Sequence, residues 1–302
     1  MRSLHLALDW TPNINHIGFF IAKRKGFYTN EDIDLTISTP GQDNYQVTPA
    51  KKVELGEADL ALCPLESILS YQSKKAPFDL KAIATIFKED LSAITVKKET
   101  VIKRPRHLDG ATYASYKARY EDHIVQEMIK NDGGEGTIKV VYPEKLGIWN
   151  TLLTNTYDAT WIFLNWEGAD TRVKEAGLTY FKMKDYQIPY SYSPVIATSA
   201  ELIHTQSGAL TSFLEATKQG YLYAVTHPKE AIEILREQLT EEDHTYIDLD
   251  NSLSLSKDSF GNEDNWGVME LENVQKFLDW IKEKGLENHH FTIETIMTNA
   301  LL

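Results

Sequence analysis

Short apolar segments alternate with amphipathic segments along the first two thirds of the chain. The apolar segments are bounded by Gly, Pro, Asp or Asn, as buried strands are, and the amphipathic segments repeat their apolar positions every three to four residues, as helices do. This pattern predicts strands at residues 4–8, 33–38, 60–62 and 80–86. Between them it predicts helices at residues 17–27, 48–56 and 66–73.

The same alternation then starts again. It predicts strands at residues 111–114, 137–142, 159–163 and 179–183, with helices at 120–131, 146–154 and 166–176. Two segments at matching places, residues 56–61 and 155–160, are weakly similar: each is a helix end, an aspartate turn and a short apolar strand. The repetition predicts two α/β lobes of similar design, each with a sheet rich in parallel strands and flanked by helices.

From about residue 207 the pattern becomes helical. We expect helices at residues 210–225, 228–239, 266–285 and 291–301, and a loop or short helix within 240–262. No low-complexity linker divides the chain, so we expect two crossing strands, within 88–96 and 190–199, to join the lobes. The predicted division is lobe 1 at residues 1–90 plus 196–302 and lobe 2 at 91–195, with a ligand cleft between them.

Composition narrows the class of partner. The chain has 302 residues, 42% of them hydrophobic and 25% charged, which is ordinary for a globular protein. Asp and Glu outnumber Lys and Arg by 44 to 31, giving a formal charge of -13. Nucleic acids and anionic membranes are bound through basic patches, so neither is expected as a partner. No stretch approaches the roughly 20 apolar residues of a membrane-spanning helix, so we expect no direct membrane insertion.

The single cysteine, Cys63, excludes an internal disulfide and a thiolate metal cluster. The adjacent His289 and His290 have no further ligand at a recognisable spacing, so we expect no metal site. Strand-like sequence begins by about Ser3, which predicts that no signal peptide precedes the fold. We therefore expect a cytoplasmic protein, or a periplasmic or cell-surface one if the chain is a trimmed mature form.

Polar and aromatic residues follow the first predicted strand at the point where it ends. In open α/β folds, ligands bind outside the carboxyl ends of strands, where loops lead into helices. Asp9, Trp10, Asn13 and His16 bring a carboxylate, a flat ring, an amide and an imidazole to such a place. Together they suit a small, flat ligand that forms hydrogen bonds. The alternative is structural: helix capping by Asp9, Asn13 and His16, and packing by Trp10.

Three further sets of polar or aromatic residues are candidates for ligand contact, because they follow predicted strands or lie on the second expected crossover. Glu66 follows the predicted strand at 60–62. Its carboxylate is either stabilised by the positive end of the helix dipole or contacts the ligand. A polar cluster after the strand at 159–163 is a second candidate for ligand contact and consists of Asn165, Trp166 and Glu167. Tyr190 and Tyr192 lie on the second expected crossover, where either ring stacks on a ligand or packs at the hinge.

These motifs resemble the SsuA/THI5-like group of the type II periplasmic-binding-protein fold. The resemblance spans about residues 3–225 and rests on the loop at 9–13, the helix end at 22–28, the turns at 56–60 and 108–110, and the segments 165–168 and 189–195. Asp-Trp-x-Pro-Asn-x-Asn-His together with Asn-Trp-Glu is similar to the branch that binds the thiamine pyrimidine, including the fungal-type pyrimidine synthases. The resemblance implies a two-lobed binding fold, an aminopyrimidine ligand and a possible ABC permease partner.

The resemblance also places an anion site of the second lobe at residues 115–120. Tyr116 and Lys117 are the candidate residues, although the small glycine-rich turn of the family is absent here. Backbone donors at a helix start, with Lys117 or Arg119, would suit a phosphate or carboxylate.

The synthases differ from this chain at the residues that carry their chemistry. Alignment on Gly56 and Asp59 puts Cys63 where the synthases have a lysine that holds pyridoxal phosphate, and Ser67 where they have a histidine. Their cysteine-rich run is replaced by residues 191–194. We therefore predict ligand binding with no cofactor and no catalytic residue. Two alternatives stay open. One is an enzyme, a divergent synthase or a hydrolase that uses the same cleft with Glu66 or His16 as base. The other is a sulfonate or nitrate binder, which would require basic residues in the cleft.

Overall fold

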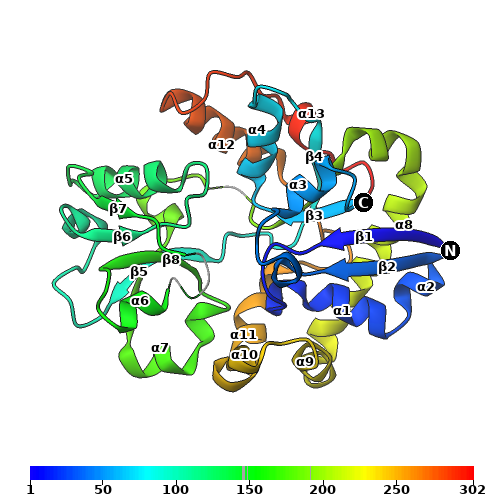
Figure 1. Cartoon of the computed structure of the whole chain (residues 1–302), viewed down its shortest axis with the longest axis horizontal. Helices are drawn as coiled ribbons and strands as arrows, with labels where there is room; N and C mark the ends of the chain where they lie inside the picture. The colour runs from blue at the N-terminus through cyan, green and yellow to red at the C-terminus, as the bar shows by residue number, and fades with distance from the viewer. Residues whose placement is uncertain (145–146, 148, 191) are drawn as a thin grey trace. The chain divides into compact units, whose positions relative to one another are not determined.

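Two five-stranded sheets organise the computed structural model, which describes residues 1–144, 147, 149–190 and 192–302 (Figure 1). Contacts between residues divide the chain into two units, one for each sheet. Unit 1 consists of Met1–Asp90, Ser191–Thr245 and Leu253–Leu302, and unit 2 of Leu91–Tyr190 and Tyr246–Ser252. The expected α/β class is confirmed, since each sheet is flanked by helices.

The sheet of unit 1 has the strand order β2-β1-β3-β10-β4. Its strands are β1 (Arg2–Ala7), β2 (Ile33–Ser38), β3 (Leu60–Cys63), β4 (Leu80–Thr85) and β10 (Val195–Ser199). β1 pairs in parallel with β2 and β3, whereas β10 is antiparallel to both β3 and β4. The four strands β1 to β4 therefore run in one direction, and the loops that follow them leave from the same edge of the sheet.

The sheet of unit 2 repeats this plan in the order β7-β6-β8-β5-β9. Its strands are β5 (Ser92–Lys97), β6 (Thr112–Ala114), β7 (Lys139–Val141), β8 (Ala159–Phe163) and β9 (Leu178–Phe181). β6 pairs in parallel with β7 and β8, and β5 is the antiparallel strand between β8 and β9. Each unit thus has one antiparallel strand at the same position in the sheet.

The two similar aspartate turns have the same role in their units. Oδ2 of Asp59 accepts a hydrogen bond from the backbone N–H of His5 (2.8 Å), and the Asp59 N–H donates to the His5 carbonyl (2.9 Å). Oδ2 of Asp158 accepts from the N–H of Thr112 (2.7 Å), and its own N–H donates to the Thr112 carbonyl (3.0 Å). Each aspartate therefore fastens the start of its strand to the neighbouring parallel strand.

Helices on unit 1 pack closely where two glycines meet. α1 (Ile17–Arg24) lies against α8 (Ala200–Thr226) and α9 (Pro228–Arg236), while α3 (Pro49–Glu54) packs on β3 and α4 (Leu65–Ser73) on β4. Figure 1 shows α1 and α3 on opposite sides of β1. A Cβ atom on Gly220 of α8 would lie 2.0 Å from the carbonyl oxygen of Gly18. Only glycine permits this approach of the two helices.

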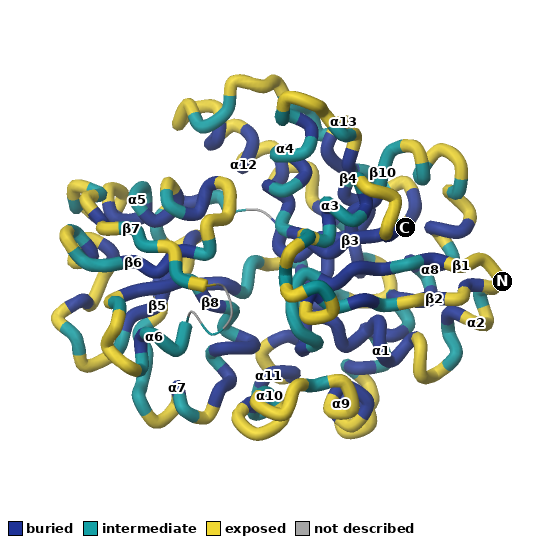
Figure 2. Tube along the Cα trace, viewed as in Figure 1, coloured by how far each residue is buried: buried dark blue, intermediate teal, exposed yellow. Residues whose placement is uncertain are grey.

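The strands form the core of each unit. Every residue of β3 is buried, and every residue of β5 except the last, Lys97, is buried as well, as Figure 2 shows in dark blue. Strands that are buried on both faces are expected to be apolar throughout, rather than alternating. This burial explains why short continuous apolar segments predicted the strands.

The helices agree less closely with the sequence prediction. α8 begins at Ala200, ten residues before the expected start, because Ser199 caps it and the chain continues through a kink at Gln206. The segment 240–262 contains α10 (Glu241–Tyr246), α11 (Leu249–Ser256) and η6 (Lys257–Ser259). The last two helices are shorter than expected: α12 (Leu271–Glu283) and α13 (Ile293–Ile296).

Apart from the 11-residue α5, the remaining helices have six residues or fewer. In unit 1 they are α2 (Phe27–Asn30), η1 (Ile14–His16) and η2 (Pro40–Asp43). In unit 2 they are α5 (Glu121–Asn131), α6 (Asn150–Leu153), α7 (Thr171–Ala176), η3 (Pro105–Leu108), η4 (Glu167–Ala169) and η5 (Met183–Tyr186). Of the helix expected at 146–154, residues 146 and 148 lie outside the described part. No helix in the described residues has the length and apolar character needed to cross a membrane.

Candidate functional site

The loop that follows β1 orients a carboxylate through a buried histidine. Nε2 of His16 lies 2.9 Å from Oδ1 of Asp9, and the His16 side chain is completely buried, whereas the Asp9 side chain is 25% exposed. The backbone N–H of Asn13 donates to Nδ1 of His16 (3.2 Å). An Nδ1 that accepts a hydrogen bond carries no proton, so the ring proton is on Nε2 and is donated to Asp9.

Asn13 belongs to the same turn. Its side-chain oxygen accepts from the N–H of Asn15 (2.8 Å), and its side-chain nitrogen donates to the carbonyl of Thr11 (3.0 Å). Together with the bond to His16, this forms a reciprocal cap at the start of η1. Asn13 and His16 therefore set the shape of the loop, and Asp9 is the polar member of the four that extends to solvent.

Trp10 is half-buried and is held by an aromatic residue that sequence reasoning did not identify. The rings of Trp10 and Tyr45 meet edge to face, with centroids 5.5 Å apart. Asn44 and Tyr45 both have positive φ angles, 52° and 60°, which is strained for a bulky tyrosine. The signal available in the sequence was an aromatic residue within the polar segment 39–48, too weak by itself to indicate a partner for Trp10.

The hydroxyl of Tyr45 is buried, and within the described residues it has no hydrogen-bond partner. Burial, with a smaller contribution from the Asp243 carboxylate, raises the pKa of Tyr45 to about 12. A strained residue with an unsatisfied buried hydroxyl is costly, and such residues are common at functional sites.

The loop after β3 brings a buried thiol and a buried carboxylate to the same edge of the sheet. Cys63 ends β3, and Glu66 lies in the first turn of α4 with 4% exposure. Burial raises the pKa of the Cys63 thiol, and the charges of Asp9 and Glu66 raise it further. Because the charges of Asp9 and Glu66 affect the pKa of the Cys63 thiol, the three side chains lie close together where β1 and β3 end. Cys63 is a buried, free cysteine.

In unit 2, the loop between β6 and α5 surrounds a carboxylate of the chain itself. Glu121, 3% exposed, accepts hydrogen bonds from the backbone N–H of Tyr116 (3.0 Å) and Ala118 (3.1 Å) and from the Tyr113 hydroxyl (2.6 Å). Lys117 is exposed, and its Nζ lies 5.3 Å from the centre of the Tyr142 ring. The backbone donors expected to hold an anion therefore hold Glu121.

The polar cluster after β8 lies mostly in the interior of unit 2. Asn165 is fully buried, Trp166 is 4% exposed and Glu167 is 9% exposed. Oε2 of Glu167 accepts from the N–H of Phe163 (2.9 Å). Burial raises the pKa of the half-buried Tyr116, as do the charges of Glu167 and Glu121, so these groups lie close together. The ends of β6 and β8 thus form one acidic and aromatic cluster.

The two tyrosines of the second crossover belong to different units. Tyr190, half-buried in unit 2, meets the ring of Trp161 edge to face at 5.2 Å. Tyr192 is buried in unit 1, and its hydroxyl accepts a hydrogen bond from the backbone N–H of Glu270 (2.8 Å). Tyr192 therefore anchors the start of α12.

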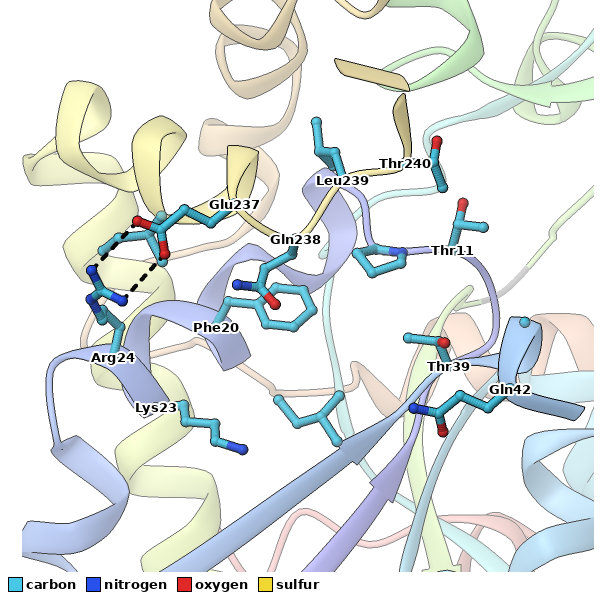
Figure 3. Close-up of a pocket in the computed structure, with 14 residues that line it drawn as sticks. Thr11, Phe20, Lys23, Arg24, Thr39, Gln42, Glu237, Gln238, Leu239 and Thr240 are labelled. Carbon is cyan, nitrogen blue, oxygen red and sulfur yellow. Dashed lines mark hydrogen bonds and ion pairs between the residues drawn. The ribbon is translucent and has the colours of Figure 1, made fainter. Parts of the chain in front are cut away.

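A separate cavity of about 730 Å³ lies in unit 1, on the α1 side of the loop after β1 (Figure 3). Phe20 and Gln238 point into it, and Arg24 pairs with Glu237 at one end, with Nη1 and Oε2 3.2 Å apart. Thr11 and Pro12 contribute to its wall, but Asp9 and Trp10 do not. The cavity and the Asp9–Trp10 surface are therefore distinct features of this loop.

A metal centre is not indicated by the described side chains. Within residues 1–144, 147, 149–190 and 192–302, no three or more His, Cys, Asp or Glu residues are grouped so that they could hold a metal ion. The site that the structure offers consists of carboxylates and aromatic rings at the carboxyl ends of strands.

Comparison with known proteins agrees with this description. The chain is 23% identical over 291 residues to a formylaminopyrimidine-binding protein of Halalkalibacterium halodurans, covering 93% of this chain and 85% of the relative. It is also 23% identical over 233 residues to a 4-amino-5-hydroxymethyl-2-methylpyrimidine phosphate synthase of Legionella pneumophila, covering 76% of this chain and 72% of the relative.

Solved structures confirm the expected fold. The ligand-binding component of an ABC-type import system from Staphylococcus aureus superposes with a TM-score of 0.73 at 14% identity, covering 100% of this chain and 98% of that structure. The chain has the periplasmic-binding-protein fold. A family model described as NMT1/THI5 like matches residues 13–231, well over half of the 302 residues. The chain therefore belongs to the NMT1/THI5-like family.

Proposed function

We propose that this protein binds a thiamine-type aminopyrimidine, such as hydroxymethylpyrimidine or its formylaminomethyl relative, without covalent chemistry. The proposal is supported by the similarity to a formylaminopyrimidine-binding protein over nearly the whole chain. It is supported independently by the kind of groups at the ends of β1 and β3, where carboxylates and aromatic rings gather.

The observation that carries the proposal is the orientation of Asp9. His16 donates its single ring proton to Oδ1, so Oδ2 keeps its lone pairs for another donor. Within the described residues, Oδ2 accepts no hydrogen bond, and the side chain is 25% exposed. An exocyclic amine of an aminopyrimidine is such a donor, and a hydrogen bond to a charged acceptor is among the stronger ones.

Trp10 supplies the stacking surface in this proposal. Its half-buried ring is fixed by the edge-to-face contact with Tyr45, which reduces the entropy lost when a flat ligand stacks on it. Stacking of a base on an aromatic side chain contributes roughly 1–3 kcal/mol. In unit 2, Trp166 and Glu167 remain candidates for ligand contact, together with Asn165, Tyr116 and Tyr190.

Calorimetry with the two pyrimidines tests the proposal directly. We expect heat of binding, and a rise in melting temperature, with hydroxymethylpyrimidine or with its formylaminomethyl relative. Taurine and ethanesulfonate at the same concentrations serve as controls, because a sulfonate binder would respond to them and not to the pyrimidines. If neither pyrimidine gives a heat of binding or a thermal shift, the proposal is ruled out.

A synthase activity is the alternative raised by the Legionella relative. Pyridoxal phosphate would require a lysine amine at the position of Cys63, where this chain has a buried thiol beside Ser67, so the residues present do not fit that cofactor. Incubation with pyridoxal phosphate tests this: an internal aldimine would give a visible absorbance band, and we expect none.

The fold also bears on the cellular role. A ligand-binding component of an ABC import system has this fold, so we propose an ABC permease as partner, with the protein acting in the periplasm or at the cell surface. Pyrimidine uptake by cells that lack the protein would fall to the level of cells that lack the permease. Unchanged uptake would instead indicate a role inside the cell.

A further inference from the structure

The cavity on the α1 side of the loop after β1 has no role in the proposed pyrimidine binding. Its volume of about 730 Å³ is within the range of roughly 300–1,000 Å³ that is typical of small-molecule sites. Its walls are α1, the loop after β1, residues 37–42 at the end of β2 and residues 234–240 at the end of α9 (Figure 3). All four segments belong to unit 1, so the cavity lies within one unit.

One part of the lining is apolar. Phe20 of α1 and Ile234 of α9 are 9% and 7% exposed, and the half-buried Ile37 and Leu239 line the same space. Figure 3 shows the Phe20 ring pointing into the cavity. Apolar surface in a concave space is removed from water when a ligand with an apolar part binds there. The cavity therefore suits a ligand with an apolar body.

The charged part of the lining is basic. It consists of Lys23, Arg24 and Glu237, two cations and one anion, in a chain whose formal charge is -13. Arg24 pairs with Glu237 through contacts of 3.2 Å and 3.4 Å, and both side chains are more than half exposed. Lys23 forms no ion pair with any residue that the structure describes, and its side chain extends from α1 toward β2 in Figure 3. The amine of Lys23 is therefore available to a bound anion.

Neutral polar side chains are the third part of the lining. Gln42 and Gln238 extend from different walls, and each amide carries both a donor and an acceptor (Figure 3). The hydroxyls of Thr11, Thr39 and Thr240 belong to the same lining. Amides and hydroxyls can donate to the oxygens of an anion that a single ammonium group leaves unsatisfied.

The Asp9–Trp10 surface has the opposite chemistry. Its polar group is a carboxylate, which accepts hydrogen bonds from a donor, and neither Asp9 nor Trp10 lines the cavity. An anion is repelled by the charge of Asp9 and attracted by that of Lys23. A ligand of the cavity therefore differs in chemical class from a ligand of Asp9.

We propose that the cavity is a second ligand site, which binds a small organic anion with an apolar body. The negative charge of the ligand pairs with Lys23, and its apolar body packs on Phe20. This inference goes beyond the proposed function and does not depend on it, because none of its steps uses a pyrimidine.

The first experiment tests the class of ligand with hexanoate, which joins a carboxylate to an apolar chain and has no ring to stack on Trp10. The affinities of hexanoate and of neutral hexanamide for the whole chain are measured by NMR titration, with sodium chloride keeping the ionic strength constant. Hexanoate should bind with a Kd of about 1 mM or lower, and at least about tenfold more tightly than hexanamide. No binding of hexanoate, or equal affinity for the two compounds, would overturn the proposal.

The second experiment tests the cation. Lys23→Gln keeps a polar side chain but removes the charge, so it should weaken hexanoate binding about tenfold and leave hexanamide binding unchanged. Lys229→Gln is the matched control, since Lys229 is an exposed lysine at the start of α9 that does not line the cavity. It should bind hexanoate as wild type does. An equal loss of affinity in both variants would show a general effect of net charge and would contradict the site.

The third experiment tests the position of the ligand by filling the cavity. Gln238 is exposed and points into the space, so Gln238→Trp fills it without removing a core side chain. Hexanoate affinity should fall at least about tenfold, while a thermal melt shows that the variant is folded. Gln42→Trp fills the cavity from another wall and replaces Gln238→Trp if that variant does not fold. Unchanged hexanoate affinity in a folded variant would place the anion elsewhere and overturn the proposal.

A competition titration separates this inference from the proposed function. Hydroxymethylpyrimidine at a saturating concentration should not displace hexanoate, because the two ligands occupy different sites. Displacement would mean that there is one site and not two, and would overturn the inference. If wild type binds no pyrimidine, the proposed function fails, and the effects of Lys23→Gln and Gln238→Trp on hexanoate still decide the role of the cavity.

Discussion

Trp10 is the residue on which the ligand proposal depends most. Replacement with alanine removes the stacking surface and should weaken pyrimidine binding by roughly 1–3 kcal/mol, about 5- to 150-fold in Kd. The melting temperature should change little, because the ring is only half-buried. Titration calorimetry and a thermal melt of the same sample separate the two effects, and Trp10→Phe, which keeps a ring, should recover part of the affinity. A large loss of stability with unchanged affinity would make Trp10 a packing residue.

At the scale of single residues, the sequence predicted local roles better than long-range partners. The caps formed by Asn13 and His16 could be anticipated because their partners lie within three residues along the chain. Tyr45 could not be paired with Trp10, since 35 residues and a strained loop separate them. Glu121 was also missed, because a glutamate in the first turn of a helix usually stabilises the helix dipole at the surface.

At the scale of elements, the contact between α1 and α8 depends on a glycine. An added Cβ at Gly220 would lie 2.0 Å from the Gly18 carbonyl oxygen, so Gly220→Ala should destabilise unit 1 by about 1–3 kcal/mol or more, through separation of the helices. Gly208→Ala is the matched control on the same helix, where a Cβ meets no atom within 4 Å. It should stabilise the protein by about 0.5–1 kcal/mol. Equal effects in urea unfolding would contradict this account of the contact.

A second element-scale contact gives a pH dependence. The Arg104 guanidinium holds the pKa of Asp132 below its usual range. Nε of Arg104 lies 2.7 Å from Oδ2 of the buried Asp132, which is the C-cap residue of α5. A lowered carboxyl pKa contributes stability that is present above the unfolded pKa of about 3.9 and is lost as the pH falls through the folded value.

Asp132→Asn should therefore melt below wild type at pH 7, with a loss of about 1–3 kcal/mol, and the difference should shrink as the pH falls below about 4. Thermal melts across that range measure the change. Glu99→Gln, an exposed acid of the same unit, should follow the wild-type curve throughout. A difference between Asp132→Asn and wild type that persists unchanged at pH 3 would mean that the side chain acts through packing.

Strands were predicted more reliably than helices, for a physical reason. A buried strand such as β3 must be apolar along its length, which a short sequence window detects. The start of α8 was misplaced because residues 200–208 are largely exposed and polar, and their helical state depends on the Ser199 cap and on a kink at Gln206. α10 contains too few turns for a period of 3.6 residues to be recognised, and of the helix expected at 291–301 only the single turn α13 forms.

At the scale of the whole molecule, the two units have the same arrangement of strands, and each contains an aspartate turn with the same hydrogen bonds. The side chains of Asp59 and Asp158 each hold the N–H of the residue that pairs with them, His5 in β1 and Thr112 in β6. Because each bond lies within its own unit, Asp59→Asn should speed hydrogen exchange at the His5 amide and leave that of Thr112 unchanged, and Asp158→Asn should do the reverse. The expected loss of protection corresponds to about 1–2 kcal/mol, since a charged acceptor is replaced by a neutral amide. Mass spectrometry of peptides covering residues 2–8 and 110–116 measures the exchange at both sites in one sample. Faster exchange at both sites in either variant would contradict this prediction, because it would show that the units do not open independently.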